Sequence, residues 1–295
     1  MTGQQDRIET KSRALWIRMF LWLVAFLLMG VLVIYQRRTG PTYPVRVNEN
    51  IGGSTVTGKL PRSHPGEGGA LVSLEALGGE VSGELVWRRY PTQDAWERLP
   101  LVREGDQLQA ELPHQSPAGK LEYSVRLEGG EPQVQLPHGE AAVIRFRGDV
   151  PPGALVPHII FMFVGLLVAL RAGLAAITME ARPDRLAPWA LGFLVPGGLI
   201  FGPVVQKYAF GEYWTGWPFG TDWTDNKTAA GILSWVLALI IARWVPALRR
   251  VAVLVAVLAT LAVYLIPHSI HGSELDWEAM EPPATAPATP GNGGR

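Results

Sequence analysis

Residues 157–178, PHIIFMFVGLLVALRAGLAAIT, decide the fold class because they form an apolar block of membrane-spanning length. The hydrocarbon core of a bilayer needs about 20 mostly apolar residues per helix, since each residue adds about 1.5 Å. Blocks of the same kind occupy residues 15–35, 187–206, 228–244 and 250–266. The sequence therefore predicts five membrane-spanning helices.

The first apolar block has two interpretations. It follows a short basic N-terminal segment, residues 1–14, as the apolar region of a cleaved signal peptide would. However, no small-residue cleavage site follows, because the block runs directly into Tyr35-Gln36-Arg37-Arg38. We interpret it as an uncleaved membrane anchor.

Arginine in the short connectors predicts the orientation. Cytoplasmic connectors are enriched in Lys and Arg, whereas acidic residues have little influence. The connectors 179–186 and 243–250 are the arginine-rich ones; they contain Arg182, Arg185, Arg243, Arg249 and Arg250. The longer loop 207–227 contains only two lysines. This asymmetry predicts a bacterial cytoplasmic (inner) membrane protein with its N-terminus inside, although the Arg37-Arg38 pair argues mildly the other way.

Between the first and second blocks lies a segment with the pattern of a β domain outside the membrane. Residues 36–69, rich in Gly, Pro and Thr, are predicted to be an extended connector, and residues 70–150 an extracytoplasmic β sandwich. Period-two alternation typical of half-buried strands is clearest at 107–112 and 121–127. The candidate strands are 70–77, 83–90, 96–103, 107–112, 120–128, 132–136 and 141–147.

One stretch of this domain resembles a known family. Leu112-Pro113 followed by Ala118-Gly119-Lys120-Leu121-Glu122-Tyr123-Ser124-Val125 is similar to the region around strand F of fibronectin type III and related immunoglobulin-like domains. The resemblance implies that Tyr123 is the corner tyrosine and Trp87 a core aromatic. The predicted fold class is thus a five-span α-helical transmembrane bundle with an inserted all-β immunoglobulin-like sandwich domain.

The third span is interrupted by helix-breaking residues. It contains Pro188, the run Pro196-Gly197-Gly198 and Gly202-Pro203. A broken helix can mark a transport site, but such residues more often give a kink and close helix packing, which we favour. Arg171 in the second span is predicted to extend its guanidinium to the cytoplasmic interface.

The loop 207–227 and its continuation form the candidate binding surface. Aromatic residues alternate here with Gly, Pro and Thr, a composition that also suits a loop lying on the membrane interface. Thr224 or Asp225 is a natural N-cap for the fourth span. The loop resembles a motif of uncharacterised multi-span bacterial membrane proteins with an exported β domain, and that resemblance implies no activity. The outer-face candidates are Trp214, Trp217, Asp222, Trp223, Asp225, Asn226, His158, His268 and His271.

A metal site is the alternative use of the same surface. His268, His271 and Glu274 recur at a spacing of three residues after the last span, and two imidazoles with a carboxylate suit zinc or copper. Asp222, Asp225 and His158 are further candidates. Because Pro267 and Gly272 disfavour a regular helix here, we expect no metal and no other cofactor.

Composition excludes several function classes. The 26 basic and 26 acidic side chains give a net charge of zero, which does not suit nucleic-acid binding. The absence of cysteine excludes disulfides and thiolate chemistry, and no catalytic motif is recognisable. We therefore expect a non-catalytic accessory protein that engages the bilayer and a protein partner at the outer face; the alternatives are a metal- or haem-handling protein and a channel or carrier. The tail 267–295 is predicted to be outside and largely disordered.

Overall fold

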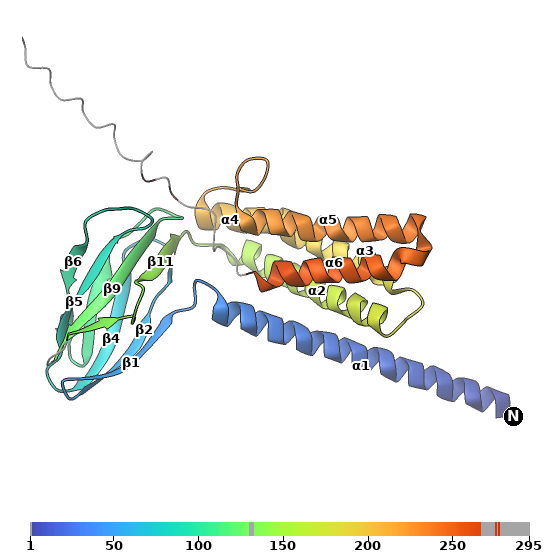
Figure 1. Ribbon diagram of the computed structural model, residues 1–295, viewed down its shortest axis with the longest axis horizontal. Coiled ribbons are helices and arrows are strands. Elements are labelled where there is room, and N and C mark those ends of the chain that lie inside the picture. Colours follow the sequence, from blue (N-terminus) through green and yellow to red (C-terminus); the bar gives the residue numbers. More distant parts are fainter. Residues whose placement is uncertain (1, 130–132, 267–274, 276, 278–295) are drawn as a thin grey trace, which may run out of the picture.

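The chain folds into a β region and a bundle of long helices, and the β region lies at one end of the bundle (Figure 1). The computed structural model describes residues 2–129, 133–266, 275 and 277. Within these residues, five helices are long and apolar enough to cross a membrane. They are Ser12–Thr39, Pro152–Ile177, Pro183–Phe210, Trp223–Trp244 and Pro246–Leu265.

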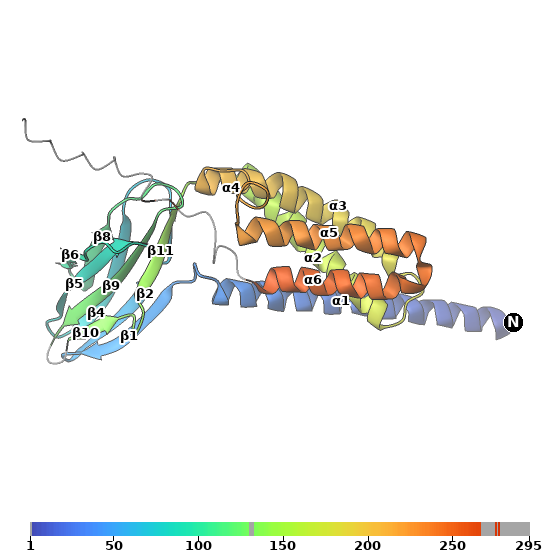
Figure 2. The same ribbon diagram turned by 45° about the horizontal axis from the view of Figure 1, so that its top comes forward.

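The helical elements subdivide these spans. They are α1 (Thr2–Thr39), α2 (Pro152–Ile177), η1 (Pro183–Leu186), α3 (Ala187–Val195), η2 (Pro196–Phe201), α4 (Gly202–Phe210), α5 (Trp223–Trp244), η3 (Pro246–Leu248) and α6 (Arg249–Leu265). Figures 1 and 2 show α1 along the flank of the other helices. Ala25 of α1 belongs to a buried cluster with Leu166 and Leu170 of α2 and Tyr264 of α6. The lengths and apolar composition of these helices are compatible with membrane insertion.

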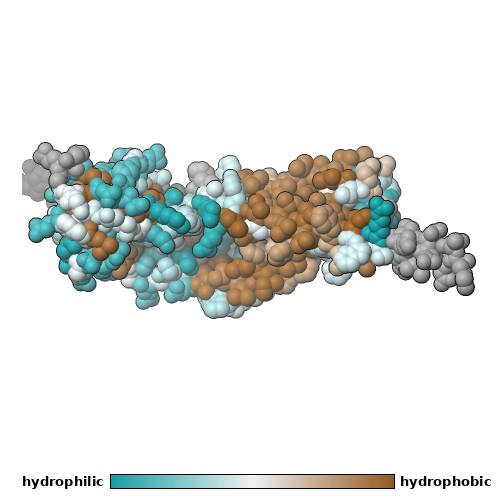
Figure 3. Space-filling view, turned by 90° about the horizontal axis from the view of Figure 1, so that it is seen from below, coloured by the Kyte–Doolittle hydropathy of each residue, from teal (hydrophilic) through white to brown (hydrophobic). Residues whose placement is uncertain are grey.

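The two ends of the helical bundle carry different parts of the chain. The α2–α3 and α5–α6 connections lie at the end far from the β region, where the N-terminal end of α1 also lies (Figure 1). At the other end, the backbone N–H of Gly148 donates to the carbonyl of Ala209, 2.9 Å away, and joins the β region to α4. Hydrophobic residues cover the helices between two hydrophilic ends (Figure 3). The arginine-rich connectors and the β region are therefore at opposite ends.

Glycine lets the third span pack closely against its neighbours. A Cβ on Gly197 would lie 2.9 Å from Sδ of Met162 in α2, and a Cβ on Gly198 would lie 2.6 Å from Cγ2 of Thr228 in α5. The backbone passes from α3 through the π-helical turn η2 into α4. The helix of this span is thus continuous through its prolines and glycines, widens locally at η2, and packs closely against α2 and α5.

Arg171 forms an ion pair at the end of α2. Its side chain is only 3% exposed, and its Nη2 donates to Oε1 of Glu180 at 2.7 Å. The guanidinium also lies 5.7 Å from the ring centroid of Trp22 in α1. The guanidinium thus pairs with a part-exposed carboxylate in the connector that follows α2, and its extension to the membrane interface stays a prediction.

Two sheets form the β region. The strands are β1 (Val45–Ile51), β2 (Ser54–Leu60), β3 (Ser63–Pro65), β4 (Ala70–Gly78), β5 (Ser82–Arg89), β6 (Glu97–Pro100), β7 (Val102–Glu104), β8 (Gln107–Leu112), β9 (Lys120–Glu128), β10 (Val134–Leu136) and β11 (Ala142–Arg147). One sheet has the order β1-β2-β4-β8-β7 and the other β3-β11-β9-β5-β6, with β10 paired to β9. The neighbours are antiparallel except for the parallel pair β3 and β11. Each of the seven predicted strand positions holds a strand, and the stretch 96–103 divides into β6 and β7, which belong to different sheets.

Alternating side chains from both sheets fill the core between them. Trp87 on β5 and Tyr123 on β9 are cross-strand partners, and both belong to the core cluster. The hydroxyl of the fully buried Tyr123 donates to the carbonyl of Pro61, 2.8 Å away, beyond the end of β2. Tyr123 therefore joins its own sheet to a backbone segment 62 residues upstream.

The predicted fold class, a five-span bundle with an inserted immunoglobulin-like domain at 70–150, is wrong. The chain has an N-terminal helix, then a sandwich-like β region over 45–147, and then the other helices, so the β region precedes most helices and the spans are not all contiguous. The predicted connector contains β1, β2 and β3. Its Gly and Thr content concealed the inward-facing residues Val47, Ile51, Val56 and Leu60.

Candidate functional site

The loop between α4 and α5, residues 211–222, is here called the aromatic loop. It starts where Gly211, at φ 92°, ends α4 and donates its N–H to the carbonyl of Lys207. Positive φ is accessible to glycine without a Cβ penalty, so this residue can terminate the helix and redirect the chain. The loop lies at the bundle end that carries the β region (Figure 1).

A buried carboxylate in the first turn of α5 holds the loop backbone. Oδ2 of Asp225, whose residue is 6% exposed, accepts from the backbone N–H groups of Thr215 (2.7 Å) and Gly216 (3.0 Å). It also accepts from Nε2 of Gln206 in α4, 3.1 Å away. Charge-assisted hydrogen bonds are stronger than neutral ones, and a buried carboxylate needs such donors. Asp225 thus connects α4, the loop and α5.

A second carboxylate caps α5. Oδ1 of Asp222 accepts from the backbone N–H groups of Thr224 (2.6 Å) and Asp225 (3.4 Å), which makes Asp222 the N-cap. Its Oδ2 accepts from the Thr215 hydroxyl at 3.2 Å. The expectation that Thr224 or Asp225 caps this helix is wrong, because α5 starts at Trp223, five residues before the predicted position 228.

The tip of the loop is fixed by Asn226. Its Oδ1 accepts from the backbone N–H of Trp217 at 2.7 Å, while the indole of the half-buried Trp214 donates to the Trp217 carbonyl at 3.1 Å. A Cβ on Gly216 would lie 2.6 Å from the Cβ of Asp225. Only glycine fits this close approach between loop and helix.

The held backbone presents exposed aromatic rings. Trp217 is 78% exposed and Phe219 83% exposed, and Trp223 at the start of α5 is 57% exposed. The side chains of Asp225 and Asn226 accept hydrogen bonds from the loop backbone. The arrangement is suited to binding, because exposed aromatic rings are held on a pre-formed backbone.

Of the residues named for a metal site, the structure describes His158, Asp222 and Asp225, and each has a hydrogen-bond partner within the protein. Nδ1 of His158, in α2, donates to the carbonyl of Gly197 at 2.9 Å, within the helices. His268, His271 and Glu274 lie outside the described residues. Within the part of the chain that is described, no group of three or more His, Cys, Asp or Glu side chains could hold a metal ion. The zinc or copper site at His268, His271 and Glu274 stays a prediction.

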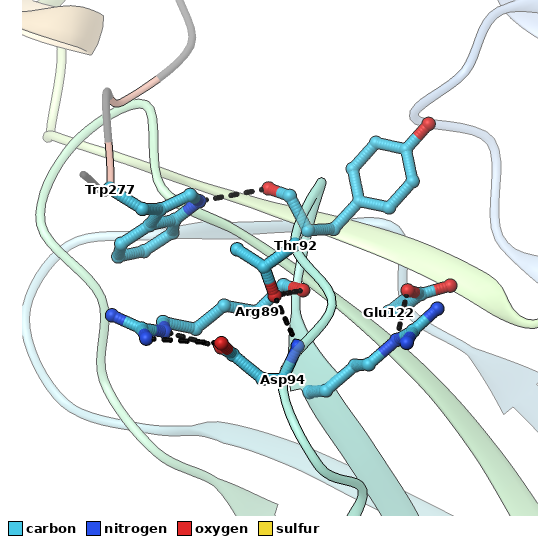
Figure 4. Close-up of polar contacts among 7 residues, drawn as sticks. Arg89, Thr92, Asp94, Glu122 and Trp277 are labelled. Carbon is cyan, nitrogen blue, oxygen red and sulfur yellow. Dashed lines mark hydrogen bonds and ion pairs between the residues drawn. The ribbon is translucent and has the colours of Figure 1, made fainter.

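Beyond the last span, the chain returns to the β region. The indole of Trp277 donates to the carbonyl of Tyr90 at 3.1 Å, and the guanidinium of Arg89 lies 5.3 Å from the indole ring centroid. Figure 4 shows Arg89 beneath the indole, with its Nε donating to Asp94 at 2.6 Å. The hydrogen bond from Arg89 lowers the pKa of Asp94. The stability that this pair contributes is therefore complete above the ordinary pKa of the carboxyl and is lost as the pH falls through the lowered value.

Comparison with protein-family models, curated proteins and solved structures finds no match for this chain. The resemblance of the 112–125 region to fibronectin type III and immunoglobulin-like domains thus has no support from known structures.

Proposed function

We propose that this protein is a non-catalytic accessory protein of a bacterial cytoplasmic membrane that binds a protein partner at its outer face through the aromatic loop. The observation that carries the proposal is the near-complete exposure of Trp217 and Phe219 on a backbone fixed by Asp225 and Asn226. Exposed rings on a fixed backbone differ from rings on a mobile loop, because binding then orders little additional chain.

Energetic reasons favour a protein as the occupant. Aromatic anchors contribute a disproportionate share of the binding energy at protein interfaces. A large ring buries much apolar area and has few rotamers to immobilise. The β region lies at the same end of the bundle (Figure 1), so a partner that binds the loop is also near the β region.

We infer the orientation from the end of the bundle that bears the arginine-rich connectors. Arg182, Arg185, Arg243, Arg249 and Arg250 belong to connections at the end far from the β region. Short connectors rich in arginine stay in the cytoplasm. The β region and the aromatic loop are then outside, where a partner in the periplasm or in the same membrane can contact both.

Photo-crosslinking in intact membranes tests the proposal. Benzoylphenylalanine placed at position 217 or 219 is expected to yield a discrete protein adduct after irradiation, because the rings there would be buried by the partner. Trp244 is the matched control, since it is 80% exposed but lies at the opposite end of α5. The same probe at position 244 is expected to give no such adduct.

Two results would reject a protein-binding role for the loop. One is labelling of lipid alone from positions 217 and 219, which would identify the loop as a bilayer belt. The other is an identical protein adduct from positions 217, 219 and 244, which would show that the crosslinks report crowding in the membrane.

A further inference from the structure

A groove at the outer end of α1 is lined by cations. It lies between α1, the β1–β2 hairpin and α2, and is here called the α1–β1 groove. Its volume is about 620 Å³. Its lining residues are Val33, Gln36, Arg37, Gly40, Pro41, Thr42, Tyr43, Pro44, Arg46, Lys59 and Phe163. Three of them are basic and none is Asp or Glu. The volume lies in the range of about 300–1,000 Å³ typical of ligand sites.

The arrangement of these cations is unfavourable without an anion. Arg46 on β1 and Lys59 on β2 are direct cross-strand partners. Like charges at such a position destabilise a sheet. Among the described residues, Arg37, Arg46 and Lys59 form no ion pair, and Arg46 donates to the hydroxyl of Tyr43 at 3.3 Å.

The depth of the groove relates it to the bilayer. Arg37 lies in the last turn of α1, at the end of the span Ser12–Thr39, whereas Val33 lies one turn deeper and Phe163 belongs to the span of α2. The wall that faces the membrane interior is therefore apolar and the rim is basic. Arg37 also belongs to the Arg37-Arg38 pair, which the predicted orientation places outside against the usual preference of arginine for the cytoplasmic side.

We propose that the α1–β1 groove binds the phosphate of an anionic phospholipid, with the headgroup held by Arg37, Arg46 and Lys59. The acyl chains would then continue along Val33 and Phe163. A zwitterionic headgroup fits less well, because the lining offers no carboxylate to its ammonium. A free phosphate would leave the apolar wall uncovered. This inference goes beyond the protein-binding role of the aromatic loop and uses none of its residues.

Native mass spectrometry of the full-length protein in detergent tests the site, with phosphatidylglycerol, phosphatidylcholine or inorganic phosphate added separately. The wild type is expected to retain phosphatidylglycerol in preference to the other two. The double variant Arg46→Ala, Lys59→Ala is expected to bind it at least about tenfold more weakly, because it loses two charged partners of one phosphate. Both side chains are exposed, so the fold is expected to persist.

Two further variants make the result specific. Arg37→Gln, which lies outside the β region, is expected to weaken phosphatidylglycerol binding as well. Arg98→Ala with Arg126→Ala removes two positive charges from the opposite sheet, where both side chains lie near Glu84, and is expected to bind like the wild type.

Four results would overturn the assignment. Equal retention of phosphatidylcholine would remove the preference for an anionic headgroup. Displacement of the lipid by millimolar inorganic phosphate would make free phosphate the ligand. Unchanged lipid binding by the groove variants would place the lipid elsewhere, and an equal loss in the Arg98 and Arg126 variant would reduce the effect to net charge. Loop crosslinking is independent of all four.

Discussion

Replacing Tyr123 with alanine is expected to destabilise the β region by about 3–5 kcal/mol. The ring is fully buried between the sheets, so its removal leaves a cavity, and the carbonyl of Pro61 loses its hydroxyl donor. Hydrogen–deuterium exchange of the full-length chain measures the effect locally. Amides of β5 and β9 are expected to exchange roughly a hundredfold to several-thousandfold faster if they open with the whole β region.

Tyr123→Phe is the matched control because it keeps the ring and removes only the hydroxyl. The expected cost is about 1 kcal/mol, the net contribution of a typical hydrogen bond, or up to about 3 kcal/mol if the carbonyl of Pro61 stays buried without a donor. Exchange in the helices is expected to stay near the wild-type rate in both variants. Wild-type exchange of β5 and β9 in Tyr123→Ala would show that Tyr123 is not a core residue.

Replacing Asp225 with alanine is expected to release the aromatic loop. The backbone N–H groups of Thr215 and Gly216 and the side-chain amide of Gln206 lose a charged acceptor together. A buried donor left without a partner costs about 1–3 kcal/mol, so the total is on the order of 3 kcal/mol or more. Chymotrypsin cleavage after Tyr213 or Phe219 is expected to become at least about tenfold faster, since local opening governs cleavage.

Glu212→Ala provides the comparison, since it removes an exposed carboxylate from the same loop. Its cleavage rate is expected to match the wild type. If Asp225→Ala resists chymotrypsin as the wild type does, the loop is held by something other than this carboxylate, and the role assigned to Asp225 is wrong.

The sequence predicts the repetitive parts of this structure well. Membrane spans depend on composition over about 20 residues, and strand positions depend on alternation, so both survive changes at single residues. The predicted connector at 36–69 is wrong because β1 and β2 carry Arg, Asn, Thr and Lys on their outward faces and only a few large buried residues, such as Val47 and Val56, on their inward faces. In that setting, turn-like composition obscured the alternation.

The candidate site was found by composition, but its mechanism of assembly was not. Asp222, Asp225 and Asn226 were predicted because they cluster beside aromatic rings, and in the structure all three side chains accept hydrogen bonds from residues of the loop. The partner Gln206 lies 19 residues from Asp225 and in a different helix, so the local sequence does not indicate the contact. The cations of the α1–β1 groove come from three elements that only the fold brings together.

Cysteine labelling tests the central claim, that the β region and the aromatic loop share one outer working face. The chain has no cysteine, so a single introduced thiol reports one position without background. In spheroplasts, a membrane-impermeant maleimide is expected to label Phe219→Cys on the loop and Val102→Cys on β7, whose native side chains are 83% and 58% exposed. Leu248→Cys, between α5 and α6, is expected to react only after permeabilisation. Labelling of Leu248→Cys in intact spheroplasts, or of Val102→Cys without Phe219→Cys, would contradict the shared outer face.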